Sequence, residues 1–322
     1  MAGLSQLSVI DYVQIDSLAA MKIIKHCHEE GSNSIDVAQG ALLGMLVNNR
    51  LEITNCFSFP KNCDDDEEYQ LEMMKNLKLV NVDHYHVGWY QSSDTGSFLS
   101  MSLLESQYHY QTSIEESVVI IYDNVKTERG FLTLKAFRLT PNAIQLYKDG
   151  EFTPEALKSH KVGYENLLVE TPVRIKNSSL TNILLSELGE LIPPQEGFNF
   201  LDLGTANVLE TQLRSLMDCV DDLNQETIKF NRFQQAIARQ TQEKHKYLQK
   251  IAQENLARQA KDEPPLPEED INKLFKPLPI PPRLGPMTLA GKVDSYSNNV
   301  TEFCLQSLAK LYLMEGLHSH KS

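Results

Sequence analysis

The chain has 322 residues, enough for one domain of ordinary size and a substantial second region. Its 43 acidic residues outnumber 30 basic ones and give a formal net charge of −13, which argues against a general nucleic-acid binder. The five cysteines are scattered without a Cys-x-x-Cys pair, as is typical of free thiols in a reducing compartment.

The sequence shows no targeting or membrane-spanning segment. Residues 1–15 lack the basic start and apolar run of a secretory signal. The longest apolar runs, such as residues 41–47, are far shorter than the roughly 18 residues that a membrane span needs. We therefore expect a soluble cytoplasmic protein that does not contact a membrane.

The N-terminal half alternates between strand-like and helix-like patterns. Residues 13–15 read as a strand, and Asp16 is a suitable N-cap for a helix over residues 17–30. Residues 41–47 and 51–57 are strand-like and are joined by a turn at 48–50, the pattern of a hairpin. Further helices are predicted at 69–79 and 100–111, and further strands at 82–90, 118–122 and 131–137. After a flexible N-terminus at 1–10, we expect an α/β domain over residues 11–175, with a mixed sheet between helices.

Three groups of metal-ligating residue types fail to form a convincing site. His26 and His28 lie two apart on a predicted helix, where side chains project about 200° apart and cannot share an ion. The acidic run at 64–68 lacks the alternating ligands and the glycine of a calcium loop. His84 and His86 face the same side of a predicted strand but have no third ligand at a useful spacing. We expect no bound metal or other cofactor.

The region from 176 to 262 is predicted to be helical, with a helix at 178–191 and a much longer one from residue 209 onward. Apolar residues on the long helix fall on a repeat of seven with steps of four and three, some of whose later positions are polar: Leu209, Leu213, Leu216, Val220, Leu223, Phe230, Ile237, Leu248 and Ile251. A helix reaching residue 261 spans roughly 80 Å, too long to bury this stripe against one domain. The stripe therefore predicts an interface with partner helices.

The second half of the long helix is rich in lysine and arginine. A solvated face is the favoured interpretation, and contact with RNA or an acidic partner is the alternative. No aromatic residues alternate with these charges as base stacking requires, which weighs against RNA.

A proline-rich stretch at 263–287 is predicted to be extended. It has the composition of a ligand for an SH3-type domain, but the apolar residues between its prolines favour docking in a groove on a neighbour. A terminal helix at 288–322 presents another apolar face for a bundle, carried by Val293, Val300, Phe303, Leu308 and Leu311.

One stretch resembles the MPN/JAMM family of zinc isopeptidases. The residues that carry this resemblance are Gly88, Trp89, Tyr90, Leu99 and Ser100. In that family Gly-Trp-Tyr is followed by two histidines and later by an aspartate that together hold zinc. Here Gln91 and Ser93 stand at the histidine positions and Leu103 at the aspartate position, and Ala41 stands where the catalytic glutamate is expected.

The resemblance therefore implies an MPN fold with a vacated active site. Catalytic zinc needs three nitrogen, sulfur or oxygen ligands and an open position for water. Gln91 and Ser93 are weak neutral donors, Leu103 has no donor, and Ala41 cannot accept a proton. The rival hypothesis is a zinc-dependent isopeptidase acting on ubiquitin-like conjugates, which requires stoichiometric zinc.

The later helices are similar to those of MPN subunits of the proteasome lid, the COP9 signalosome and translation initiation factor 3, where C-terminal helices form a shared bundle. Segments at 23–26, 50–57, 86–92, 114–119, 138–141, 263–270 and 273–277 favour translation initiation factor 3. This resemblance implies a non-catalytic scaffold paired with a sister MPN protein, the f subunit. The whole factor would bind the small ribosomal subunit and support recruitment of initiator tRNA and mRNA. A scaffold role in one of the other two assemblies is the alternative.

Overall fold

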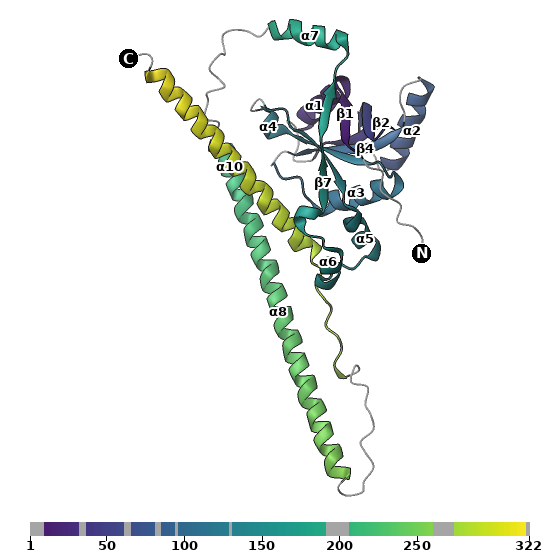
Figure 1. Cartoon of the computed structure of the whole chain (residues 1–322), viewed down its shortest axis with the longest axis vertical. Helices are drawn as coiled ribbons and strands as arrows, with labels where there is room; N and C mark the ends of the chain where they lie inside the picture. Colours follow the sequence, from purple (N-terminus) through teal and green to yellow (C-terminus); the bar gives the residue numbers. More distant parts are fainter. Residues whose placement is uncertain are drawn as a thin grey trace.

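The computed structural model of the chain describes residues 10–31, 37–60, 66–80, 85–93, 96–128, 131–190, 206–259 and 274–319. A body of sheet and helices lies to one side of two long crossing helices (Figure 1). The expected flexible segment 1–10, except its last residue, lies outside the described residues, as do His84 and the first part of the proline-rich stretch.

The body is built on one eight-stranded sheet, which confirms the predicted α/β class. Its strands are β1 (Tyr12–Asp16), β2 (Gln39–Val47), β3 (Arg50–Ser58), β4 (His86–Ser93), β5 (Val118–Asp123), β6 (Leu134–Leu139), β7 (Leu168–Thr171) and β8 (Val173–Lys176). Their order is β7-β6-β5-β4-β2-β3-β1-β8. The sheet is mixed, because β4 runs parallel to β5 and β1 runs parallel to both β3 and β8, while the other pairs are antiparallel.

Local sequence explains two of these pairings. Asn48 and Asn49 join β2 to β3 with φ angles of 48° and 60°, the left-handed geometry that asparagine tolerates in a two-residue hairpin. Gly88 in β4 has a φ of 155°, and a Cβ atom there would collide with the carbonyl oxygen of Val118 on β5. The glycine of the Gly-Trp-Tyr stretch thus permits the close parallel pairing of β4 and β5.

Two strands differ from their predicted ranges. The strand predicted to end at residue 90 continues to Ser93, because β4 pairs with β5 as far as Asp123. The strand predicted at 131–137 lies at Leu134–Leu139, where it pairs with β5 on one side and β7 on the other. Strand ends are set by pairing partners, which the alternation of side chains does not reveal.

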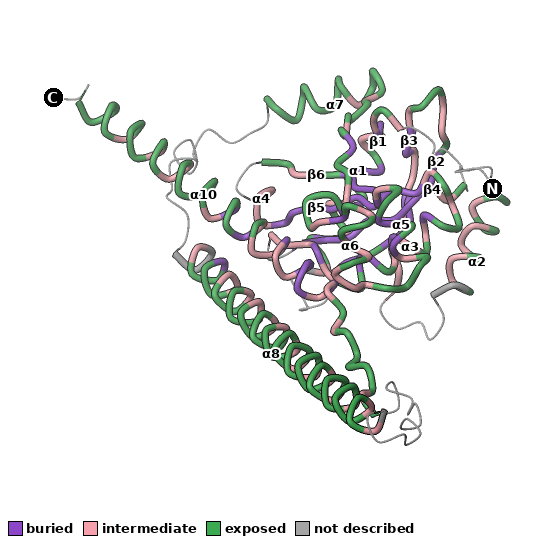
Figure 2. The backbone as a smooth tube through the Cα atoms, turned by 60° about the horizontal axis from the view of Figure 1, so that its bottom comes forward, coloured by how far each residue is buried: buried purple, intermediate pink, exposed green. Residues whose placement is uncertain are grey.

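Helices cover both faces of the sheet. They are α1 (Ser17–Gly31), α2 (Asp66–Leu79), α3 (Met101–Ser113), α4 (Asn124–Glu128), α5 (Pro141–Asp149) and α6 (Pro154–His160), with a 3-10 turn at Tyr164–Asn166. Successive residues of β4 serve opposite faces, as strand geometry requires. Tyr90 packs in the core with α1, and Trp89 packs in the core with α3 and α5. Figure 2 shows that the central strands β4 and β5 are largely buried.

The C-terminal region adds α7 (Ser179–Glu190), α8 (Ala206–Gln259) and α10 (Leu284–Ser319). The 54 residues of α8 confirm the long helix, about 80 Å at 1.5 Å per residue. The terminal helix begins at Leu284 rather than at the expected residue 288. The physical reason is burial, because Leu284 and Met287 lie in the core that contains Trp89. None of the described helices combines the length and apolar character needed to cross a bilayer.

The first half of α8 packs antiparallel against α10 (Figure 1). Gln212 lines the same cavity as Asn299, whereas Arg283 lies over the Phe230 ring, 4.2 Å from its centre. Residue numbers thus rise along α8 as they fall along α10. The partner for this part of the stripe is therefore supplied by the chain itself, which corrects the expectation that the stripe waits for other helices.

An extended segment at 276–282 follows the second half of α8. Gln240 donates a hydrogen bond from Nε2 to the carbonyl oxygen of Lys276, at 2.7 Å. The rings of Tyr247 and Phe275 meet edge to face with centres 5.9 Å apart. Residues 276–282 of the predicted stretch 263–287 thus lie outside helix and sheet and contact their own chain, whereas residues 284–287 form the first turn of α10, which corrects the expected extended range.

A buried polar network joins α3 to the sheet. Gln107 accepts a hydrogen bond from Trp89 Nε1 at 2.8 Å and donates to Gln111 and to the carbonyl of Ser117, each at 3.2 Å. Gln111 continues the network to Leu139 by accepting from its backbone N–H, at 2.9 Å. The two glutamine side chains and the Trp89 indole N–H are paired, so the network stabilises the fold only while it is complete.

Replacing Gln107 with leucine should therefore be costly. The variant would leave the Trp89 indole N–H and the Ser117 carbonyl without partners, so the free energy of unfolding should fall by roughly 2–4 kcal/mol. Urea denaturation of the full chain measures this change. Glu105→Gln, an exposed change on the same helix, is the control, and an equal effect of both variants would contradict the network's role.

His86 should make stability depend on pH. Burial lowers its pKa, an effect that a hydrogen bond to the Gly88 backbone partly offsets. The unfolded chain then takes up the proton first, near pH 6.5, so the free energy of unfolding should fall as the pH drops below that value. One proton contributes at most about 1.4 kcal/mol per pH unit.

The free energy of unfolding of His86→Gln, measured between pH 7.5 and about pH 5, checks this effect. The variant should lose the part of the pH dependence that His86 contributes. His109→Gln, at an exposed position of α3, should keep it. Identical slopes for wild type and His86→Gln would show that the histidine does not contribute.

Candidate functional site

The residues at the vacated family positions lie on β2, on β4 and in the first turn of α3. Ala41 on β2 is opposite Trp89, and Gln91 on β4 is opposite Gln39. Ser93 ends β4 beside Asp123, which ends the parallel strand β5. Because two parallel strands end together here, their last side chains share one edge of the sheet.

Two of these positions have become part of the packed interior. Ala41 and Leu103 are each only 1% exposed, and Leu103 packs in the core that contains Trp89. The helix start around Leu103 is intact, because the hydroxyl of Ser100 accepts a hydrogen bond from the Leu103 backbone N–H at 3.1 Å. Neither residue offers a ligand atom or a proton acceptor.

The two positions on β4 offer only neutral oxygen and nitrogen atoms. Gln91 accepts a hydrogen bond from Gln39 Nε2 through its Oε1, at 3.2 Å. The Ser93 hydroxyl is buried and has no hydrogen-bond partner among the described residues. In the described part of the chain no group of three or more His, Cys, Asp or Glu side chains is arranged to hold a metal. The residues present thus do not fit the zinc of the family.

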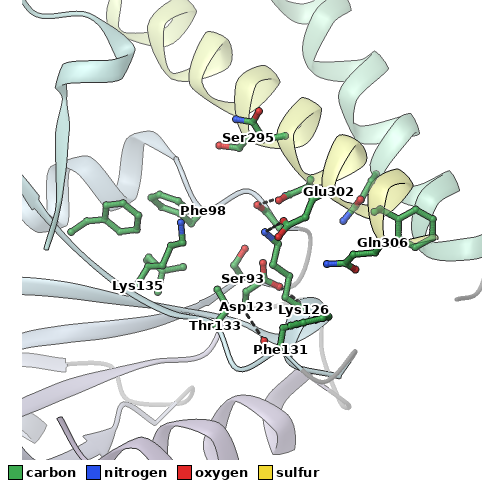
Figure 3. Close-up of a pocket in the computed structure, with 17 residues that line it drawn as sticks. Ser93, Phe98, Asp123, Lys126, Phe131, Thr133, Lys135, Ser295, Glu302 and Gln306 are labelled. Carbon is green, nitrogen blue, oxygen red and sulfur yellow. Dashed lines mark hydrogen bonds and ion pairs between the residues drawn. The ribbon is translucent and has the colours of Figure 1, made fainter. Parts of the chain in front are cut away.

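A cavity of about 460 Å³ opens beside Ser93 and Asp123. Figure 3 shows that its walls come from the strand ends on one side and from α10 on the other. Asn299 of α10 donates a hydrogen bond from Nδ2 to the carbonyl of Gly96 at 2.8 Å, and Lys126 forms an ion pair with Glu302 at 2.6 Å. The terminal helix thus covers the edge of the sheet where the resemblance places the metal.

The charged groups of the cavity are largely paired. The carboxylate of Asp123 accepts a hydrogen bond from the backbone N–H of Lys126 at 3.0 Å and so caps α4. Lys135 lies 3.5 Å from Glu170. With two lysines set against acidic partners, the cavity has no strong preference for an anion or a cation.

Outside this edge of the sheet, the histidines and cysteines that could bind a metal or react are either packed or exposed. The Nδ1 atom of half-buried His26 lies 2.9 Å from the Tyr90 hydroxyl, and His28 is exposed. These positions confirm the predicted packed or solvated placement of the pair. Burial raises the pKa of the Cys56 thiol to about 12, which keeps it protonated and unreactive.

The predicted partner-helix residues divide into two sets. Leu209, Leu216, Leu223, Phe230, Val293, Val300 and Phe303 are half-buried. The residues that stay exposed are Leu213, Val220, Ile237, Leu308 and Leu311, with exposed fractions of 39%, 45%, 38%, 52% and 46%. The second set is thus the more exposed one within this chain.

Sequence reasoning missed the apolar face of α7. Its exposed apolar residues are Leu180, Ile183, Leu184, Leu185 and Leu188. Leu180, Ile183, Leu184 and Leu188 have the three- and four-residue spacing of one helix face, which the sequence pattern over residues 179–190 contains. Sequence reasoning also missed exposed Met217 and Ile228 on α8, which extend the open surface around Leu213 and Val220.

Comparison with known proteins agrees with this architecture. The family model for JAB1/Mov34/MPN/PAD-1 ubiquitin protease matches residues 8–116, and the model for the C-terminal region of eIF3h matches residues 127–322. The H subunit of eukaryotic translation initiation factor 3 from Bombyx mori is 67% identical over 316 residues, which cover 98% of this chain and 94% of the relative.

The H subunits of the same factor from Culex quinquefasciatus and Aedes aegypti are each 62% identical over 317 residues, again 98% of this chain and 94% of the relative. The matches extend over both the sheet domain and the C-terminal helices, and they confirm the resemblance to the MPN subunits of this factor. The chain belongs to the family of the H subunit of eukaryotic translation initiation factor 3.

Proposed function

We propose that this chain is a non-catalytic scaffold within translation initiation factor 3 in the cytoplasm. The observation that carries the non-catalytic part is the burial of Ala41 and Leu103 at positions where the enzymes of this fold need a glutamate and an aspartate. Such apolar, enclosed side chains can neither hold zinc nor accept a proton. The name shared by the relatives supports the assembly.

The scaffold role rests on apolar surface that the chain leaves open. The exposed leucines of α7, the Leu213 and Val220 side of α8 and the end of α10 beyond Phe303 have no cover among the described residues (Figure 2). Helices with such faces gain stability by burying them against other helices. We propose that bundle-forming subunits cover them, and that the MPN domain pairs with the f subunit.

At the level of the whole factor, the proposed role is binding of the small ribosomal subunit and recruitment of initiator tRNA and mRNA. For the basic half of α8 a solvated face remains the favoured interpretation. Lys229 pairs with Glu226 at 2.6 Å, and Arg258 lies 3.7 Å from Glu254. Pairs of this kind within one helix weaken the attraction to a phosphate backbone.

We also propose a division of the chain that follows these roles. Residues 11–175 form the MPN domain, 176–262 carry the C-terminal helices and 263–283 form the proline-rich segment. The bundle helix then begins at 284, since α10 starts there.

Metal analysis tests the rival hypothesis of a zinc isopeptidase. The purified chain should contain well below one zinc ion per molecule, because two of its four vacated positions are apolar and buried. It should also fail to cleave isopeptide-linked ubiquitin chains with or without added zinc. An active zinc isopeptidase of the same fold is the positive control, and stoichiometric zinc together with chelator-sensitive cleavage would contradict the proposal.

Charges on the open part of α10 test the scaffold role. Leu308→Asp combined with Leu311→Asp should release the chain from its assembly, because burying an unpaired carboxylate costs several kcal/mol. Both side chains are exposed within the chain, so its own unfolding should change little. Affinity purification followed by mass spectrometry measures the loss of partners.

The matched control carries Thr301→Asp and Ala309→Asp, two charges at other positions of the same helix. Normal recovery of initiation factor subunits with the leucine variant would contradict a role of this surface in assembly. Recovery of proteasome-lid or signalosome subunits with the wild-type chain would favour the alternative assemblies. Leu216 and Leu223 are unsuitable for this purpose, since they are half-buried on the helix pair α8–α10.

A further inference from the structure

Residues 276–282 form a strap that leads to the start of α10 and is held at both ends (Figure 1). At one end the carbonyl oxygen of Lys276 accepts a hydrogen bond from Gln240 of α8, at 2.7 Å. At the other end the backbone N–H of Arg283 donates to the carbonyl oxygen of Phe152 in the sheet domain, at 2.9 Å. Because its ends are fixed, the strap needs little further ordering when a partner binds it.

The sequence of the strap dictates an extended backbone. Every residue from 276 to 282 is a proline or stands directly before one. Proline fixes its own φ at about −65° and disfavours the helical region for the residue before it. Such a sequence favours a polyproline II helix, which has three residues per turn. Side chains three apart in sequence therefore lie along the same edge of the strap.

One edge of the strap faces its own chain. Continued by one residue at each end, this edge carries Phe275, Leu278, Pro281 and Leu284. Phe275 meets the ring of Tyr247 on α8, and Leu284 lies in the core of the sheet domain. Pro281 is half-buried between them. The apolar side chains of this edge are thus partly used inside the chain.

A second edge is open and carries Lys276, Pro279 and Pro282, all of them exposed. On the remaining edge Pro277 is exposed and Ile280 is 50% exposed. Two prolines three apart are the pattern that the aromatic grooves of SH3-type domains recognise. Lys276 lies one turn before Pro279, so its side chain follows the same edge. A groove that fits this edge offers aromatic rings to the prolines and a carboxylate to the lysine.

We propose that the strap is a docking site for an SH3-type domain of another protein. The aromatic groove of that domain covers Pro279 and Pro282, and an acidic residue at the end of the groove pairs with Lys276. This partner differs from the helical subunits that the proposed function assigns to the open helix faces. The two proposals rest on different residues and can fail independently.

The test uses the full chain and a panel of purified SH3 domains. Each domain is titrated by calorimetry with the chain and, separately, with a synthetic peptide of residues 274–284. At least one domain should bind both, and it should bind the chain at least as tightly as the peptide, because the strap is already ordered. Pro279→Ala combined with Pro282→Ala should weaken binding to the chain about tenfold or more, and Lys276→Glu about threefold or more.

The matched control is Pro264→Ala combined with Pro267→Ala. These two prolines have the same spacing, but Asp262, Glu263 and Glu268 flank them. The carboxylate that pairs with a lysine in the groove repels such neighbours. The control variant should therefore bind the domain as tightly as the wild-type chain does.

Three results would overturn the proposal. They are no binding of any SH3 domain to the chain, binding to the peptide but not to the chain, and equal affinities for the wild type and the Pro279 and Pro282 double variant. The second result would mean that α8 closes the strap to partners. Circular dichroism checks that each variant is folded, and Lys276→Glu serves as the test if the double variant is not.

Discussion

Burial of the first turn of α10 in the core of the sheet domain is the contact on which the C-terminal half depends. Leu284 and Met287 lie in the same core as Trp89 and Leu103, so the terminal helix starts inside the domain that the N-terminal half builds. Fixing that turn fixes the direction of α10. The direction of α10 in turn places α8, because the first half of α8 packs against α10. The hydrophobic effect thus joins segments almost two hundred residues apart in sequence into one architecture.

At two of the vacated positions, packed apolar side chains stand where the resembled family has catalytic and metal-binding groups. A metal site needs polar ligands held in an enclosed but solvent-connected pocket, which is costly to maintain without the metal. With leucine at position 103 and alanine at position 41, that space becomes ordinary packed interior. The N-cap at Ser100 and the pairing of β4 with β5 keep their geometry. The helix start and the strand pairing that frame this region are thus present, with alanine and leucine packed at two of its positions.

The terminal helix α10 covers the edge of the sheet at which β4 and β5 end. The Asn299–Gly96 hydrogen bond and the Lys126–Glu302 ion pair hold the helix over the strand ends. An exposed ion pair contributes little by itself, so apolar burial at the start of α10 supplies most of the stability. Beyond Gln306, the last residue of α10 that lines the cavity, Leu308, Leu311 and Leu313 are exposed. The first part of α10 therefore packs within its own chain, and its last part is exposed.

The sequence by itself determined the class of the fold, the long helix and the identities of the residues at the vacated positions. These follow from local information: side-chain periodicity, turn residues and the chemistry of single positions such as Gln91 and Ser93. The short elements α5, α6, β7 and β8 escaped prediction, because few residues carry each pattern and their partners are distant in sequence.

Only the tertiary structure decided which apolar residues face inward. Leu213 and Leu216 belong to one repeat, yet Leu213 is 39% exposed and Leu216 is half-buried. A repeat of apolar residues predicts which side of a helix is apolar. The direction of the helix that packs against it decides which of those residues are buried. That direction is set by the burial of Leu284 and Met287, a contact between segments that no local pattern connects.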